Sequence, residues 1–255
     1  RRRGAKKEGA IAKGFFNKSP KRKEPAGAAA PPAPQRRQPL EEEQGEVGKA
    51  RTEGLRLLRE GSHAEAQAAF RQMRRLALEA GQGRAEGRAL CLLARALEAA
   101  GAAEPEVEDA YKQALKIAHN QDDMELSFSV LTGMGSHALQ TGDADLAEHF
   151  YLQSQTLARR VLTEREEAVA EGNLGRCLAQ GVARRPEALE HFRRATALQE
   201  RAGTDRSPQA VRALHTSLDA FALDEDLRKE AQGLLKRVAP LSEQAQEFED
   251  WEIDL

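Results

Sequence analysis

The pattern of apolar, small and polar positions from about Glu46 to Gly203 repeats four times along the chain. Each copy holds two segments of helical length, so we interpret it as a helical hairpin. A single hairpin cannot bury its apolar face alone, and stacking of neighbouring hairpins has to supply the core. The pattern predicts helices at about 46–60, 64–80, 84–100, 105–119, 124–141, 144–160, 164–180 and 187–202.

Two sets of positions keep one period through all four copies. Small residues stand 40, 41 and 40 positions apart, at Gly54, Ala94, Gly135 and Gly175. Aromatic residues stand 41, 40 and 41 positions apart, at Phe70, Tyr111, Tyr151 and Phe192. We expect the small residue to let the second helix of its hairpin approach closely. We expect the aromatic ring to be buried between one hairpin and the next.

Glycines mark the predicted ends of the first helices, at Gly61, Gly101 and Gly142. Glycine accepts the left-handed conformation that commonly ends a helix. Asp143 follows Gly142 directly and is a predicted N-cap of the next helix.

A fifth hairpin is predicted after the fourth copy, with helices at 208–221 and 224–238. Ser207 and Pro208 predict its start as a cap followed by proline at the first helical position. Gly233 stands where the period would place an aromatic residue. A degenerate last unit is typical of a capping hairpin whose outer face meets water.

The repeated units resemble a known family. A small residue in the first helix, followed by Ala-x-x-x-Phe/Tyr-x-x-Ala/Ser in the second, is similar to the tetratricopeptide repeat. The period and the string Gly172-Asn173-Leu174-Gly175 resemble the longer repeats of the Pins/LGN and kinesin-light-chain type. The units depart from the pattern because they lack the leading Trp and the closing Pro, and because Ala94 replaces glycine.

The resemblance covers about 160 of the 255 residues and implies an all-α fold. The expected architecture is a right-handed α-solenoid of about four hairpins plus the C-terminal capping hairpin, over residues 41–238. The resemblance also implies a non-enzymatic adaptor that binds peptide segments of other proteins in its concave groove, which the first helices line.

Carried over one by one, the groove positions of the family are rich in arginine and contain no acid. The candidate groove residues are Arg51, Arg88, Arg95, Gln140, Asn173 and Arg176, with Arg59 at the edge. Guanidinium groups bind carboxylates bidentately, so an acidic peptide is the expected ligand. The alternative is a face that is merely solvated.

The formal net charge of −2 conceals ends of opposite sign. Residues 1–40 hold twelve Lys or Arg against two Glu, whereas the last eighteen residues hold six acids and no base. The basic segment has too few apolar residues to offset the entropy of ordering, so we expect it to be disordered. We expect 239–255 to be an acidic tail.

The basic tail supports several hypotheses. Lys18, Lys21, Arg22 and Lys23 resemble a nuclear localisation signal, although a solvated basic tail would look the same. Ser19 precedes a proline and two bases, as in sites of cyclin-dependent kinases, where a phosphate would weaken the basic patch. Phe15 and Phe16 resemble a degenerate PCNA-interacting box. An organelle-targeting peptide is a further alternative. A nuclear, nucleic-acid- or replication-associated factor is the alternative function, with the repeats as tether.

The acidic tail contains the chain's single tryptophan. Trp251 stands among five acids between Glu247 and Asp254 and resembles the acid-flanked tryptophan peptides that kinesin-light-chain-type repeats bind. This tail could therefore occupy its own groove or that of another protein, or it could simply be acidic and disordered.

Enzyme, cofactor and metal motifs are missing from the sequence. The tripeptide Glu-His-Phe occurs twice, at His149 and His191, but both histidines flank the aromatic positions and are expected to be repeat residues. Cys91 and Cys177 fall inside predicted first helices, where buried reduced thiols are expected. Together with the lack of a membrane span, they favour an intracellular protein, nuclear or cytoplasmic.

Overall fold

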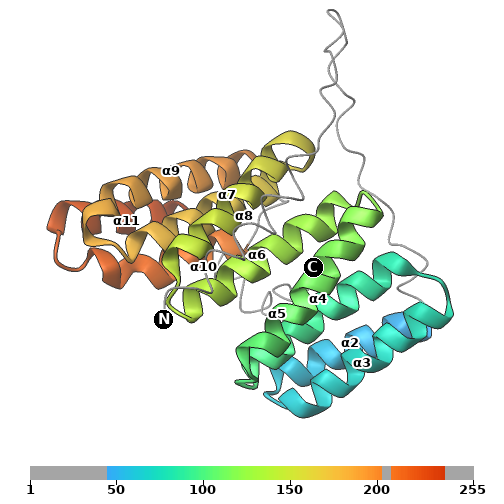
Figure 1. The fold of residues 1–255 in the computed structure, drawn as a ribbon. Helices are drawn as coiled ribbons and strands as arrows, with labels where there is room; N and C mark the ends of the chain where they lie inside the picture. The colour runs from blue at the N-terminus through green and yellow to red at the C-terminus, as the bar shows by residue number, and fades with distance from the viewer. Residues whose placement is uncertain (1–44, 203–207, 239–255) are drawn as a thin grey trace, which may run out of the picture. The chain divides into compact units, whose positions relative to one another are not determined.

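The structure is a computed structural model that describes residues 45–202 and 208–238, and every regular element in these ranges is a helix. Figure 1 shows the helices as consecutive antiparallel pairs. The helices are α2 (Glu46–Arg59), α3 (His63–Glu79), α4 (Gly83–Ala99), α5 (Glu104–Asn120), α6 (Met124–Gln140), α7 (Ala144–Val161), α8 (Glu164–Ala179), α9 (Arg185–Ala202), α10 (Pro208–Ser217) and α11 (Glu225–Val238). Two 3-10 turns, η2 (Val182–Arg184) and η3 (Leu218–Phe221), precede α9 and α11.

The four predicted hairpins are confirmed as α2–α3, α4–α5, α6–α7 and α8–α9, with boundaries within two residues of those expected. The predicted single helix over 208–221 is wrong in its last four residues, which form η3. Thr216 and Ser217 explain the change. Their hydroxyls donate to the carbonyls of Arg212 at 3.0 Å and Ala213 at 2.8 Å, and such bonds compete with regular helix geometry.

The turns after the first helices have the expected geometry. Gly61, Gly101 and Gly142 have φ of 76°, 68° and 86°, in the left-handed region. The amide after each glycine donates to a carbonyl five residues back, as in Ser62 to Leu57 at 2.9 Å. Asp143 is the N-cap of α7, because its carboxylate accepts from the Leu146 amide at 3.0 Å. The second helices α3 and α5 end in the same way, at Gly81 and at Asp122, which the sequence did not single out.

The small and aromatic positions meet in the core as predicted. Phe70, Tyr111, Tyr151 and Phe192 are all buried. A Cβ atom at Gly54, Gly135 or Gly175 would lie only 2.5–2.8 Å from the aromatic ring of the same hairpin. The glycine therefore leaves the space that the ring fills. A Cβ atom at Gly133 of the following hairpin would likewise lie 2.6 Å from the Tyr111 ring.

The capping hairpin replaces the missing aromatic by another route. Gly233, where the period would put the ring, is exposed. Phe221 from η3 is fully buried instead and meets the Phe192 ring edge-on, with 6.3 Å between the ring centroids. The last unit thus keeps an aromatic contact although it loses the sequence period.

Cys91 in α4 and Cys177 in α8 are buried free thiols, as predicted. Burial raises the pKa of each thiol to about 11, so both remain protonated near neutral pH. Among the described helices, none combines the length and apolar content needed to cross a bilayer.

Candidate functional site

The first helices of the hairpins form one continuous surface. α4 contacts both α2 and α6, and α6 contacts α8. We call this surface the inner face. On it, residues spaced three or four positions apart along each helix lie in line, and these are the positions that the resemblance assigned to a groove.

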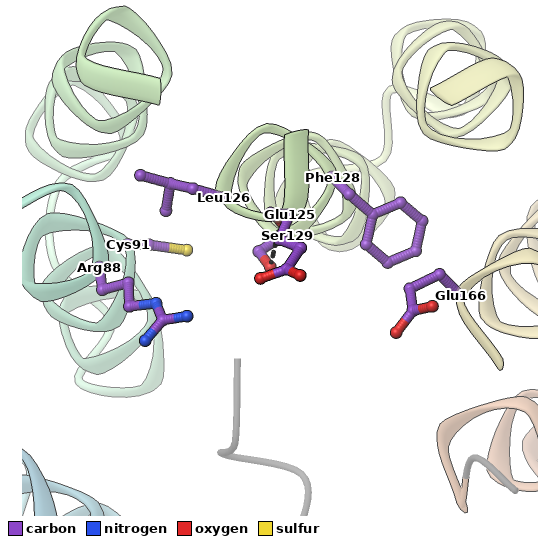
Figure 2. A pocket seen from close by; sticks show the side chains of 7 residues that line it. All are labelled: Arg88, Cys91, Glu125, Leu126, Phe128, Ser129 and Glu166. Carbon is purple, nitrogen blue, oxygen red and sulfur yellow. Dashed lines mark hydrogen bonds between the residues drawn. The ribbon is translucent and has the colours of Figure 1, made fainter. Parts of the chain in front are cut away.

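The central part of the inner face is hollowed into a pocket of about 120 Å³. Figure 2 shows Arg88 on the α4 side, the Glu125 carboxylate from α6 in the middle, and the Phe128 ring turned toward Glu166 of α8. Cys91, Leu126 and Ser129 complete the lining. Three successive hairpins therefore contribute to one pocket, which no single hairpin could form.

The pocket carries charges of both signs, because Glu125 and Glu166 line it together with Arg88. Glu125 pairs with Arg84, which also lies 2.7 Å from the Asp123 carboxylate. Glu166 accepts from the Thr163 amide at 3.0 Å and closes the capping box of α8. Both acids thus have a role at a helix start. The repeat alignment could have found them, since they lie one turn before the Arg88 position on the same stripe.

Beyond the pocket, toward the C-terminal ends of the same helices, lies a second polar group of residues. Glu98 of α4 and His137 of α6 are both mostly buried, and Nδ1 of His137 lies 3.1 Å from a Glu98 oxygen. Burial raises the pKa of Glu98, while His137 and then Arg95 and Arg176 act in the opposite direction. The sequence did not indicate this buried carboxylate or its contact with His137.

Arg176 links this group to the core. Its Nη2 donates to the Tyr151 hydroxyl at 2.9 Å and, at 3.5 Å, to the Asn173 side-chain oxygen. The Tyr111 hydroxyl is buried as well, and it has no hydrogen-bond partner among the described residues. Burial and the nearby Cys91 and Glu98 raise the pKa of Tyr111, so the hydroxyl keeps its proton.

The structure joins some of the predicted groove residues and separates others. Arg88 lines the pocket, and Arg176 donates to Asn173 on the same helix. The positive charges of Arg95 and Arg176 act to lower the pKa of Glu98. Arg51 is half-buried on α2. Gln140 is exposed at the last residue of α6.

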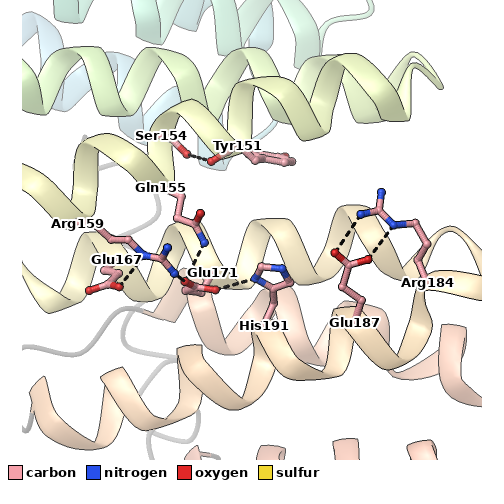
Figure 3. Close-up of polar contacts among 9 residues, drawn as sticks. All are labelled: Tyr151, Ser154, Gln155, Arg159, Glu167, Glu171, Arg184, Glu187 and His191. Carbon is pink, nitrogen blue, oxygen red and sulfur yellow. Dashed lines mark hydrogen bonds and ion pairs between the residues drawn. The ribbon is translucent and has the colours of Figure 1, made fainter.

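We call the group of residues in Figure 3 around Glu171 the buried carboxylate network. Glu171 of α8 is fully buried and accepts from Gln155 Nε2 at 2.8 Å, lies 2.7 Å from Nδ1 of His191, and pairs with Arg159. Burial acts to raise the pKa of Glu171, but His191, Arg159 and Gln155 outweigh it and lower the pKa. This network ties α7, α8 and α9 together.

The two Glu-His-Phe histidines are not equivalent. His191 contacts Glu171, whereas His149 lies 2.6 Å from the Gln153 side-chain nitrogen and beside the Phe150 ring. Within 45–202 and 208–238, no group of three or more His, Cys, Asp or Glu side chains is arranged to hold a metal ion.

The tail hypotheses fall outside the described residues. This applies to the basic signal at Lys18, Lys21, Arg22 and Lys23, to Ser19, to Phe15 and Phe16, and to Trp251. They stay predictions, as do the domain limits 1–40 and 239–255.

A tetratricopeptide-repeat family model matches residues 126–201. No curated protein matches the sequence. Among solved structures, TPR-like repeats of a kinesin light chain from Podosopora anserina align with a TM-score of 0.56 and 18% identity, covering 78% of this chain and 95% of theirs. A single-substitution variant of these repeats aligns with a TM-score of 0.57 and 18% identity, covering 82% of this chain and 99% of that one.

BtubC (BKLC) from P. vanneervenii aligns with a TM-score of 0.54 and 18% identity, covering 80% of this chain and 93% of that one. At such identities the structural likeness concerns the fold, and the family model supplies the sequence relationship. Residues 126–201 thus match the tetratricopeptide-repeat family, and the described helices share the fold of kinesin-light-chain-type repeats.

Proposed function

We propose that this chain is a non-enzymatic interaction scaffold that holds an extended peptide segment of a partner protein along its inner face. One observation carries the proposal: α4, α6 and α8 all contribute side chains to a single pocket. An extended segment that crosses the first helices can contact several hairpins at once. Such a segment gains specificity from side-chain pockets spaced along its length.

The charges of the inner face favour a peptide whose acidic part has a defined position. Arg95 and Arg176 stand in the C-terminal halves of α4 and α8 and favour carboxylates there. Glu125 and Glu166 disfavour carboxylates over the pocket, where Phe128 offers an apolar surface. We therefore expect an apolar or aromatic anchor in the pocket and acidic residues toward Arg95 and Arg176, since charges set direction while a buried anchor supplies affinity.

The acidic segment 241–255 has this composition, with Trp251 as the anchor and carboxylates around it. It is a proposed ligand, either of its own chain or of another copy. A tethered segment of this kind acts at a millimolar-scale effective concentration, so weak intrinsic affinity would suffice.

The test is the binding of a fluorescein-labelled peptide with the sequence of residues 241–255 to the full chain, followed by fluorescence anisotropy. Arg88→Gln should weaken binding about tenfold, the size of one charge-assisted contact. Arg160→Gln is the matched control, because Arg160 is exposed on the second helix α7. Equal binding by both variants would remove the inner face as the site. Deletion of 241–255 should raise affinity if the tail binds in cis, and so should Trp251→Ala.

A further inference from the structure

The first hairpin, α2–α3, carries a second pocket between the start of α2 and the end of α3 (Figure 1). We call it the amino-terminal pocket, and it has a volume of about 380 Å³. Val47 is buried and Leu76 packs against the core, so these two side chains give the pocket an apolar wall. This pocket shares no residue with the pocket between α4, α6 and α8.

The polar groups of the amino-terminal pocket bring negative charge and no base. Glu46 and Glu79 line it, and Glu79 is exposed with no ion-pair partner among the described residues. Glu46 pairs with Lys49 at 2.8 Å. The side-chain oxygen of Gln82 is a buried acceptor that also lacks a hydrogen-bond partner within residues 45–202 and 208–238. A ligand group that carries donors and a positive charge would satisfy these atoms.

The end of α3 adds to this negative charge. The Gln82 amide donates to the Ala77 carbonyl at 2.9 Å, and the carbonyls after Ala77 lie at the negative end of the helix dipole. The second helices α5, α7, α9 and α11 each have a histidine, arginine or lysine in their last turn, which offsets this end. α3 has none there and ends in Glu79 instead. The first hairpin therefore lacks a cation that the other second helices supply from their own sequence.

We propose that the missing cation is the guanidinium group of Arg37, and that the amino-terminal pocket is a docking site for the segment just before α2. Arg37 lies outside the described residues, and it is the base closest in sequence before Gly45. Its guanidinium pairs with Glu79 and donates to the Gln82 oxygen, while its methylene stem covers the apolar wall. The inference is independent of peptide binding to the inner face.

The length of the preceding segment and the order of its charges fit this contact. Arg37 precedes Gly45 by eight positions, and an extended chain of that length spans up to about 27 Å. Since Gly45 itself lines the pocket, the guanidinium group reaches the end of α3. Glu41, Glu42 and Glu43 stand between the two and precede the positive end of α2, where acids are favourable. The acids thus suit the start of α2, and the base suits the end of α3.

The first test is thermal unfolding of the full chain. Arg37→Gln should lower the melting temperature by about 2 °C, the size of one favourable charge at a helix end in a chain of this length. Arg36→Gln removes the same charge one position away and is the matched control, with no loss expected. Equal losses for the two variants would overturn the inference, and so would no loss for either.

A double-mutant cycle assigns the contact to the pocket. In a Glu79→Gln background, the loss caused by Arg37→Gln should fall to about half, because the ion pair is gone. In a Glu65→Gln background it should stay at about 2 °C, since Glu65 is an exposed acid at the opposite end of α3. A loss that is the same in both backgrounds would rule out the docking of Arg37 in this pocket.

A spin label reports the contact without relying on stability. Cys91 and Cys177 are buried, so in the Gln38→Cys variant the label reacts only with the introduced thiol. The label should broaden the amide signals of residues 79–82 more than those of 63–66, and adding Arg37→Gln should reduce the broadening at 79–82. Broadening that Arg37→Gln leaves unchanged would mean that chain connectivity alone keeps the label near the pocket, and the proposal would be wrong.

Discussion

The second and third hairpins carry a tyrosine at the same repeat position but give its hydroxyl different surroundings. Tyr151 fills the space above Gly135 of its own hairpin, and its hydroxyl accepts from Arg176. Tyr111 lies against Gly133 of the next hairpin, and its hydroxyl has no hydrogen-bond partner among the described residues.

The two hairpins also differ by one methyl group beside the ring. The second hairpin has Ala94 where the other three have glycine, and a Cβ at Gly135 would come within 2.6 Å of the Tyr151 ring. A ring therefore cannot stand in the same place above Ala94. Equal spacing along the sequence therefore does not give the two rings the same position over the small residue.

The largest expected effect on stability comes from removing the Tyr151 ring, which fills the space that Gly135 leaves. Tyr151→Ala should lower the free energy of unfolding by about 3–5 kcal/mol, because it empties a fully buried site. Gly135→Ala alone should cost about 1–3 kcal/mol through overpacking. In the Tyr151→Ala background it should cost nothing, because the ring is gone. Chemical denaturation of the unaltered chain, the two single variants and the double variant measures the free energy of unfolding of each. If the costs of the two single substitutions simply added in the double variant, the pairing of Gly135 with Tyr151 would be refuted.

A second effect of comparable size contrasts the two buried carboxylates. The pKa of Glu171 is lowered below its ordinary 4.5, so its contribution to stability is present above pH 4.5 and is lost as the pH falls through the lowered pKa. Glu171→Gln should cost about 2 kcal/mol at pH 7, and this difference should shrink below pH 4.5.

The pKa of Glu98 is raised, so its effect on stability changes with pH in the direction opposite to that of Glu171. The unaltered chain should lose stability relative to Glu98→Gln as the pH rises from 4.5 through the raised pKa. Urea denaturation of the unaltered chain, Glu171→Gln and Glu98→Gln at several pH values gives the pH dependence of each variant's stability relative to the unaltered chain. Slopes of equal sign for the two variants would contradict the contrast.

The sequence was sufficient for the fold because the repeat period, the helix-ending glycines and the buried aromatic rings are local or periodic signals. It was insufficient for Phe221, which replaces a periodic ring from a 3-10 turn outside the period. It also missed Glu98, His137 and Glu171, because their partners lie on other helices and nothing in the local sequence around each acid indicates burial. The arginines of the first helices were visible in the sequence, but not the buried contact between Glu98 and His137.

The two tyrosine hydroxyls provide a sharper and smaller test. Tyr151→Phe should cost about 1.5–2 kcal/mol, because it removes a hydrogen bond to a charged group. Tyr111→Phe should be neutral or stabilising by up to about 1 kcal/mol, because it removes a buried hydroxyl that lacks a partner among the described residues. Thermal and urea denaturation check the pair. A loss for Tyr111→Phe as large as that for Tyr151→Phe would show that the two hydroxyls are equally satisfied.

The smallest expected effect concerns Ala94 itself. If every hairpin needed glycine at this position for its ring, Ala94→Gly would restore the pattern and leave stability unchanged or higher. In the structure the Tyr111 ring is buried with the Ala94 methyl group in place and lies against Gly133, and Ala94 is fully buried in α4. Glycine would then only increase the backbone entropy lost on folding and remove a packed methyl group, at a cost of about 1 kcal/mol. Urea denaturation of Ala94→Gly beside the unaltered chain decides between the two outcomes, and a gain in stability would mean that the methyl group displaces the ring at a cost to the fold.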